Sequence, residues 1–113
     1  MEKIASIVIR GKRKAQTLGF PTANLALGKS EMESGVYVGK AFFDGNEYAA
    51  AVFVGRDRDV LEAHILDFEG DLYGKKIEVE VGQKLREAVK FESEKQLINQ
   101  VLKDLASVRK ANP

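Results

Sequence analysis

The hydrophobic period of this chain changes once, and that change limits the folds it can adopt. Before residue 86 the apolar side chains come in short β-branched or alternating runs, such as Lys76-Ile77-Glu78-Val79-Glu80-Val81. Such alternation is typical of half-buried strands, whereas spacings of three and four residues indicate an amphipathic helix. The helical spacing begins after Ser93, with Leu97, Ile98, Val101, Leu102, Leu105 and Val108. The pattern predicts a small antiparallel barrel with one helix laid against it.

Turn residues divide the first part of the chain into predicted strands. The predicted strands cover residues 4–10, 35–43, 47–54, 60–68 and 76–81. A glycine kink at Gly82 would let the last strand continue to Leu85. Asp44-Gly45-Asn46 predicts a hairpin turn. Ser93 followed by Gln96 is the signature of a capping box at the start of the helix.

The composition excludes several classes of protein. We expect a single domain over residues 1–113. The 18 basic and 17 acidic residues nearly cancel, so nothing indicates a broad nucleic-acid or membrane surface. The absence of cysteine excludes disulfides and thiolate metal sites, and it fits a cytoplasmic location. No apolar run is long enough to span a bilayer, and we expect a monomer.

Thr22 and Asn24 are the first candidates for a binding site. In an extended segment, residues two apart point to the same side, so the two side chains can present neutral oxygens to one cation or to a phosphate that it carries. Pro21 restrains the backbone there. The alternative is that Thr22 and Asn24 satisfy backbone groups in a turn, which is the commoner use of these residue types.

The segment before this run is basic. Lys12, Arg13 and Lys14 could attract phosphates, and Gly11 would let a backbone approach closely. The segment is not a Walker motif, because the spaced Gly-Lys-Thr is missing. A solvated surface loop explains the same residues.

Four further residues could carry chemistry or bind a ligand. Glu62 and His64 should point the same way from their strand. Glu62 could be a base for a hydroxyl nucleophile, or it could face water. His64 alone, without a second histidine or a cysteine, does not indicate zinc. Arg86 and Phe91 suit the border of a planar ligand, and they equally suit an ordinary corner between barrel and helix.

Several blocks occur in the order seen in riboflavin kinases, and over roughly residues 7–109 the chain resembles that family. The first blocks are Leu18-Gly19-Phe20-Pro21-Thr22-Ala23-Asn24-Leu25, Gly35-Val36-Tyr37 and Leu61-Glu62-Ala63-His64-Ile65-Leu66-Asp67-Phe68. The later ones are Asp71-Leu72-Tyr73-Gly74-Lys75, Leu85-Arg86, Phe91 and the final helix with Asp104. The resemblance is to the kinase domain that ends the bacterial bifunctional enzymes and stands alone in eukaryotes.

The resemblance implies a mainly β fold, a six-stranded antiparallel Greek-key barrel with a C-terminal α-helix packed on it. It implies transfer of the ATP γ-phosphate to the 5′-hydroxyl of riboflavin, giving FMN and ADP, with Mg²⁺ or another divalent ion. By position, Glu62 would be the base, and Thr22 and Asn24 would bind the metal. Nucleotide binding would involve Gly11, Lys12, Arg13, Lys14, Gly19, Pro21, Thr22 and Asn24. Arg86 and Phe91 would border the flavin.

Two blocks depart from the family pattern and leave other functions open. Ala15-Gln16 stand where the family has a Gly-Arg pair, and residues 56–59 replace a Pro-Thr-Phe block. These departures motivate an alternative, a non-catalytic flavin or nucleotide sensor on the same barrel. A third hypothesis is a barrel that binds single-stranded nucleic acid through the basic segment, against which the near-zero net charge argues.

Overall fold

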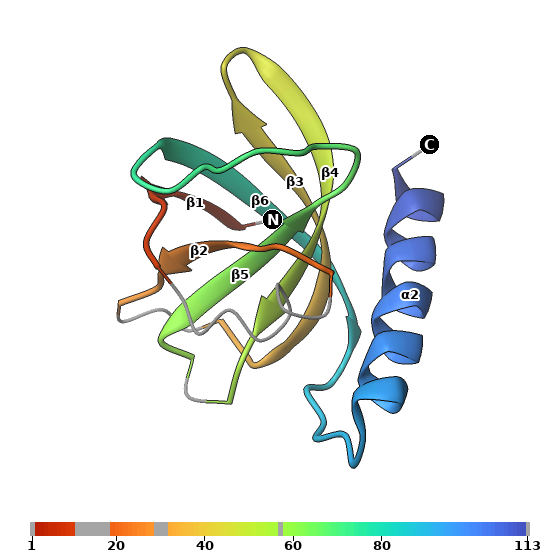
Figure 1. The fold of residues 1–113 in the computed structure, drawn as a ribbon. Helices are drawn as coiled ribbons and strands as arrows, with labels where there is room; N and C mark the ends of the chain where they lie inside the picture. Colours follow the sequence, from red (N-terminus) through yellow and green to blue (C-terminus); the bar gives the residue numbers. More distant parts are fainter. Residues whose placement is uncertain (1, 11–18, 29–31, 57, 113) are drawn as a thin grey trace.

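The structure is a computed structural model, and it describes residues 2–10, 19–28, 32–56 and 58–112. The chain forms six strands and one helix in this part of the sequence (Figure 1). The elements are β1 (Glu2–Ile7), β2 (Ala23–Ala26), β3 (Gly35–Phe43), β4 (Asn46–Val54), β5 (Val60–Ile65), β6 (Lys76–Arg86) and α2 (Glu94–Ala111).

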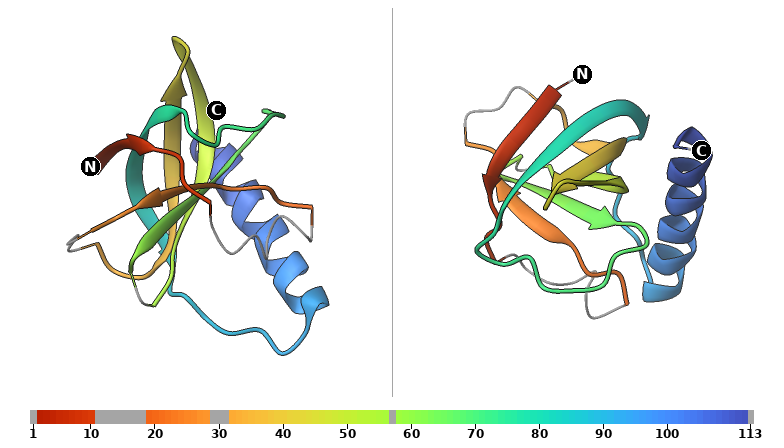
Figure 2. Two further views of the ribbon diagram at one scale, coloured as in Figure 1. Left: turned by 60° about the vertical axis from the view of Figure 1, so that its left-hand side comes forward. Right: turned by 90° about the horizontal axis from the view of Figure 1, so that it is seen from above.

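The strands form one antiparallel sheet that curls into a nearly closed barrel. Their order is β1-β6-β3-β4-β5-β2, so β1 and β2 are the edges that must meet. They meet just beyond the end of β1, where the Ile9 N–H donates to the Asn24 carbonyl at 2.8 Å. The view from above in Figure 2 shows the strands surrounding a common interior. The predicted mainly β barrel with a C-terminal helix is confirmed.

The barrel interior is filled by alternate residues of the strands. On β5 the inward residues are Leu61, Ala63 and Ile65, as the alternation predicted, and Glu62 and His64 point outward. Inward residues of β4 and β6 complete the fully buried centre, among them Val52, Val54, Ile77 and Val79. Burial of this apolar surface stabilises the barrel and holds the outward residues of β5 in fixed positions.

Two strands end earlier than the sequence pattern predicts. β1 stops at Ile7 because the chain leaves β6 there and crosses to β2. β5 stops at Ile65 because the Leu66 N–H donates to the Ala49 carbonyl and Asp67 then adopts a positive φ of 60°. A residue in that conformation cannot continue a strand.

The register of the β3–β6 pair is irregular near the end of β6. Tyr37 pairs with Lys84, but Gly39 pairs with Val81, so β6 has one additional residue at the predicted kink near Gly82. Gly39 allows the strands to come close here. A Cβ atom at this position would lie 2.6 Å from Val52 Cγ2 and 2.9 Å from the Glu80 carbonyl oxygen.

The helix α2 runs along one side of the barrel, against β3 and β4 (Figure 1). Ser93 caps it as predicted: its side chain accepts a hydrogen bond from the Gln96 N–H at 3.2 Å. Val101 and Val108 of the predicted apolar stripe are buried, whereas Leu102 is 52% exposed and lies outside the contact face. No helix among the described residues is long and apolar enough to cross a membrane.

Candidate active site

The Pro-Thr-Ala-Asn run leads into β2, the edge strand that pairs with β5, and Ala23 and Asn24 are the first residues of that strand. Gly19 takes a positive φ of 93°, which turns the chain into the run. Asn24 stands opposite Glu62 in the β2–β5 register. The Thr22 hydroxyl donates a hydrogen bond to Glu62, with 3.3 Å between Oγ1 and Oε1. The structure therefore brings Thr22, Asn24 and Glu62 together, although Glu62 is some forty residues away in sequence.

Asn24 has an oxygen that the protein leaves without a partner. The residue is 6% exposed, and its Nδ2 donates to the Thr22 carbonyl at 3.3 Å. Its Oδ1 is buried and accepts no hydrogen bond in the described part of the chain. A buried polar atom normally has a partner, so this oxygen is a candidate ligand for a bound group. Together with the Thr22 hydroxyl it forms an all-oxygen donor set, which fits Mg²⁺.

His64 holds the same run from the next outward position of β5. Its Nδ1 donates a hydrogen bond to the Pro21 carbonyl at 2.7 Å. The Phe20 ring meets the imidazole edge-on, with 6.0 Å between ring centroids. Two outward side chains of β5 thus hold this run: His64 bonds its backbone at Pro21, and Glu62 bonds the Thr22 side chain.

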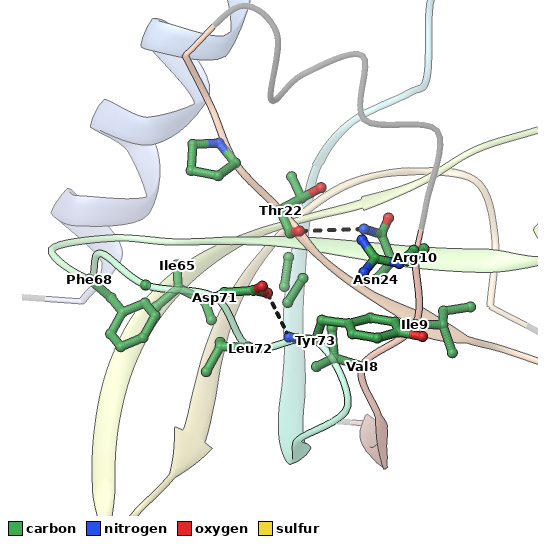
Figure 3. A pocket seen from close by; sticks show the side chains of 14 residues that line it. Val8, Ile9, Arg10, Thr22, Asn24, Ile65, Phe68, Asp71, Leu72 and Tyr73 are labelled. Atoms are coloured by element: carbon green, nitrogen blue, oxygen red, sulfur yellow. Dashed lines mark hydrogen bonds between the residues drawn. The ribbon is translucent and has the colours of Figure 1, made fainter.

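A cavity of about 400 Å³ opens beside the seam where the segment after β1 meets β2. We call it the seam cavity. Its polar lining includes Arg10, Thr22, Asn24, Asp71 and Tyr73, and Pro21 also lines it (Figure 3). Its apolar floor comes from the barrel interior, from residues such as Ala63 and Ile65. This cavity is the one that a ligand of the Thr22 and Asn24 oxygens would enter.

A second cavity of about 630 Å³ lies between the barrel and the start of α2. We call it the helix-side cavity. Glu62, Arg86 and Phe91 line it, together with apolar residues of β3 and β4 that include Val36 and Phe53. Glu62 therefore faces the helix-side cavity while its carboxylate accepts the hydrogen bond from Thr22, a residue of the seam cavity.

The Arg86 guanidinium is already bound within the protein. Its Nη2 donates to Asp104 Oδ2 at 2.8 Å and its Nε donates to Asp104 Oδ1 at 3.0 Å. Gln100 also donates to Asp104 Oδ1, and the Asp104 side chain is only 4% exposed. The Arg86 Cζ lies 5.7 Å from the centroid of the Phe91 ring. Arg86 therefore ties β6 to α2, and it supports the Phe91 side of the helix-side cavity.

Tyr37 and Lys84, which are paired near the start of β3, have pKa values shifted from their ordinary values. Burial raises the pKa of Tyr37, whose hydroxyl donates to the Glu33 carbonyl. The hydrogen bond to Glu87 is the main cause that raises the pKa of Lys84, and a hydrogen bond to Glu33 adds to it. Both groups keep their ordinary protonated states at neutral pH, so neither is a base near the two cavities.

The structure describes only some of the residues that the sequence predicted for the site. Gly11, Lys12, Arg13 and Lys14 lie outside the described residues. Gly19 shapes the chain but does not line the seam cavity. The sequence did not indicate Arg10 as a site residue. Tyr73 was indicated only as part of the segment Asp71-Leu72-Tyr73-Gly74-Lys75, which resembles the riboflavin kinase family. No local sequence pattern predicts that Arg10 and Tyr73 belong to one site. They come together only because the segment after β1 pairs with the turn at residues 70–75 in the folded barrel.

Comparison with known proteins shows where this architecture occurs. Residues 2–112 match the flavokinase family, described as riboflavin kinase. The chain is 38% identical over 112 residues to the trifunctional protein RibF/MnmA of Mycoplasmoides gallisepticum, covering 92% of the chain and 16% of that protein. It is 36% identical to the bifunctional riboflavin kinase/FMN adenylyltransferase of Pseudomonas fluorescens, covering 95% of the chain and 37% of that protein. The chain thus spans well under half the length of these relatives.

Two solved structures share the fold of this chain. A structure from Streptococcus pneumoniae described as a macrolide-efflux protein superposes with a TM-score of 0.84 and 31% identity, over 95% of this chain and 38% of that chain. The Trypanosoma brucei riboflavin kinase superposes with a TM-score of 0.73 and 23% identity, over 96% of this chain and 78% of that chain, and supports the fold. On the family match over nearly its whole length, the chain belongs to the riboflavin kinase family.

Proposed function

We propose that this chain transfers the γ-phosphoryl group of ATP to the 5′-hydroxyl of riboflavin, giving FMN and ADP. The observation that carries the proposal is the 3.3 Å contact between Thr22 Oγ1 and Glu62 Oε1. It joins a polar cavity suited to phosphates with a larger, partly apolar cavity suited to a planar ring. Phosphoryl transfer depends mainly on positioning and charge neutralisation, so a junction between two substrate cavities is the arrangement it needs.

Glu62 is the base in this proposal. A ribityl hydroxyl in the helix-side cavity would donate its hydrogen bond to the Glu62 carboxylate, which orients the oxygen toward the seam cavity. As the new bond from that oxygen to the γ-phosphorus forms, the bond from the γ-phosphorus to the leaving ADP oxygen breaks. The hydroxyl proton passes to Glu62. The Thr22 hydroxyl holds the carboxylate in place until then.

Thr22 and Asn24 would hold a divalent cation on the other side of the junction. When bound, Mg²⁺ neutralises phosphate charge. The orphaned Asn24 Oδ1 and the Thr22 hydroxyl supply two neutral oxygens. Mg²⁺ usually takes its remaining ligands from water and substrate phosphates rather than from a full protein cage.

The flavin side of the proposal rests on the lining of the helix-side cavity. Phe91 and Phe53 offer aromatic surface, and Val36 and Val101 offer aliphatic surface. An isoalloxazine ring is planar and largely apolar, and such rings stack or pack edge-on against aromatic side chains. The Arg86–Asp104 pair would fix this wall rather than neutralise a charge on the ligand.

The experiment is a turnover assay with riboflavin and MgATP, with chromatographic separation of FMN and ADP. We expect equimolar FMN and ADP, and none without nucleotide or in the presence of excess chelator. A folded protein that forms no FMN contradicts the proposal. If that protein still quenched riboflavin fluorescence, a binding-only flavin domain would be the better explanation.

A further inference from the structure

Arg10 lies at the seam of the barrel, next to the residues that would hold the cation. Its neighbour Ile9 donates a backbone hydrogen bond to the Asn24 carbonyl at 2.8 Å. On the other side, Val8 exchanges backbone hydrogen bonds with Lys75 and Gly74, each at 2.9 Å. The backbone that carries Arg10 is thus held between β2 and the turn before β6. Both Arg10 and Asn24 line the seam cavity (Figure 3).

The Arg10 side chain is also held. Its Cζ lies 4.2 Å from the centroid of the Tyr73 ring, so the guanidinium stacks on the aromatic face. Stacking uses the flat face of a guanidinium and leaves the N–H groups at its edge able to donate hydrogen bonds. Both side chains are exposed, so the contribution of the Tyr73 ring is to restrict where the guanidinium lies.

The charge of Arg10 has no acidic partner within the described part of the chain. The acidic group in the lining of the same cavity is Asp71, and one of its oxygens accepts a hydrogen bond from the Tyr73 N–H at 2.9 Å. Asp71 thereby shapes the turn that presents the Tyr73 ring. Among the described residues, this stacked guanidinium has no hydrogen-bond acceptor and the nearby Asn24 Oδ1 has no donor, an arrangement in a polar cavity that is suited to a phosphate with its cation.

We propose that Arg10 binds the phosphate chain of the nucleotide across the seam cavity from Thr22 and Asn24, and that Tyr73 holds its guanidinium ready. This inference rests on the proposed function, because it assigns a residue to the nucleotide of that reaction. It also supplies a fixed positive charge to a chain that has Ala15-Gln16 in place of the family's Gly-Arg pair.

The test compares four variants with the wild-type chain. Arg10→Ala removes the guanidinium, Arg10→Lys keeps a charge without the planar fork, and Tyr73→Leu removes the stacking ring. Lys103→Ala, at an exposed position of α2, is the matched control for loss of one positive charge. Each protein is measured for MgADP affinity by calorimetry, for the KM of MgATP and kcat, and for riboflavin affinity by fluorescence quenching.

We expect Arg10→Ala to weaken MgADP binding and raise the KM for MgATP by about 10- to 100-fold, the usual effect of losing a charged hydrogen bond. Arg10→Lys should recover part of this loss. Tyr73→Leu should cost roughly 2- to 5-fold, the effect of one exposed cation–π contact. Riboflavin affinity should not change, because Arg10 does not line the helix-side cavity.

The outcomes separate this inference from the proposed function. Nucleotide affinity of Arg10→Ala within twofold of Lys103→Ala overturns the inference, as does an equal loss of riboflavin affinity, which would indicate general disruption. A wild-type chain that makes no FMN refutes the proposed function, and the MgADP titration then still decides the role of Arg10. A wild-type chain that binds no MgADP refutes both.

Discussion

Thr22, just before β2, meets Glu62 of β5, with the threonine hydroxyl 3.3 Å from the carboxylate oxygen that accepts its hydrogen bond. Thr22 lines the seam cavity, and Glu62 lines the helix-side cavity. A single hydrogen bond therefore connects the places proposed for the two substrates. Thr22 directly precedes β2, whose register places Asn24 opposite Glu62, so the pairing of two short strands brings the hydroxyl and the carboxylate together.

Glu62→Gln should lower kcat by about 10²- to 10⁴-fold, because an amide accepts the hydroxyl hydrogen bond but cannot take the proton. Riboflavin affinity, measured by fluorescence quenching, should stay within a few fold. Glu69→Gln, at an exposed position of the turn after β5, is the control and should keep normal turnover. Unchanged kcat in Glu62→Gln would remove this residue from the proposed mechanism.

Asn24→Leu should separate function from stability. Leucine has a similar size, and it replaces a buried amide whose Oδ1 has no partner in the described part of the chain. The substitution also loses the hydrogen bond to the Thr22 carbonyl. We expect the free energy of unfolding in urea to be unchanged or raised by up to about 1 kcal/mol, since an orphaned polar atom is costly.

The same variant should need at least about 10-fold more Mg²⁺ for half-maximal turnover, because one of two proposed metal oxygens is gone. Asn24→Asp is the matched variant: it keeps an oxygen and adds charge, so it should need less Mg²⁺ than Asn24→Leu. Identical Mg²⁺ requirements in all three proteins would show that Asn24 does not bind the cation.

Local sequence pattern predicted five of the six strands and the helix, but it missed β2 (Ala23–Ala26) and the places where the elements meet. The alternation along β5 correctly predicted that Glu62 and His64 lie on the same side of the strand, and Ser93 with Gln96 correctly predicted the helix start. The early end of β1 has no local signal, because it depends on where the chain crosses from β6 to β2.

In the site as well, local sequence pattern predicted only what lies within one segment. Thr22 and Asn24 share a local run, so their spacing was enough to pair them. The pairing of Arg10 with Tyr73 joins residues about sixty positions apart through the closure of the barrel. Likewise, the residue types of Arg86 and Phe91 suited a ligand border and a corner between barrel and helix equally, and the fold binds the Arg86 guanidinium to Asp104 of the helix.

His64→Ala should affect the nucleotide side of the reaction more than the flavin side. The variant loses the 2.7 Å hydrogen bond to the Pro21 carbonyl, so the run that presents Thr22 is held less firmly. We expect a loss of about 1 kcal/mol in stability and a raised KM for MgATP, with riboflavin affinity unchanged. His64→Gln, whose amide can still donate, should recover part of the KM. A purely structural role would lower stability without changing the KM.

Asp104→Leu should destabilise the protein by roughly 3 kcal/mol in urea unfolding, because it leaves the Arg86 charge without its buried partner. Gln100 loses its acceptor as well. The double variant Arg86→Met/Asp104→Leu should recover most of this loss, since it removes both charges and keeps apolar volume between β6 and α2. Equal destabilisation in the single and double variants would contradict this account of the pair.

The ion pair between Asp67 and Arg109 should make stability depend on pH in acid. Arg109 donates to both Asp67 oxygens, at 2.8 and 2.9 Å, and ties the end of α2 to the turn after β5. The hydrogen bond from Arg109 lowers the pKa of Asp67 below its ordinary value of 3.8. A lowered carboxyl pKa means that the folded state holds its proton less tightly than the unfolded state. The pair therefore stabilises fully above pH 3.8, and this contribution is lost as the pH falls through the lowered value.

Asp67→Asn isolates this effect, because asparagine also tolerates the positive φ of 60° at this position. We expect the wild-type chain to melt a few degrees higher at most at neutral pH, since both partners are exposed and solvent screens the pair. The difference in Tm should shrink as the pH falls below 3.8, and added salt at neutral pH should shrink it too. A difference that persists unchanged in strong acid would mean that the aspartate acts through its backbone conformation and not through its charge.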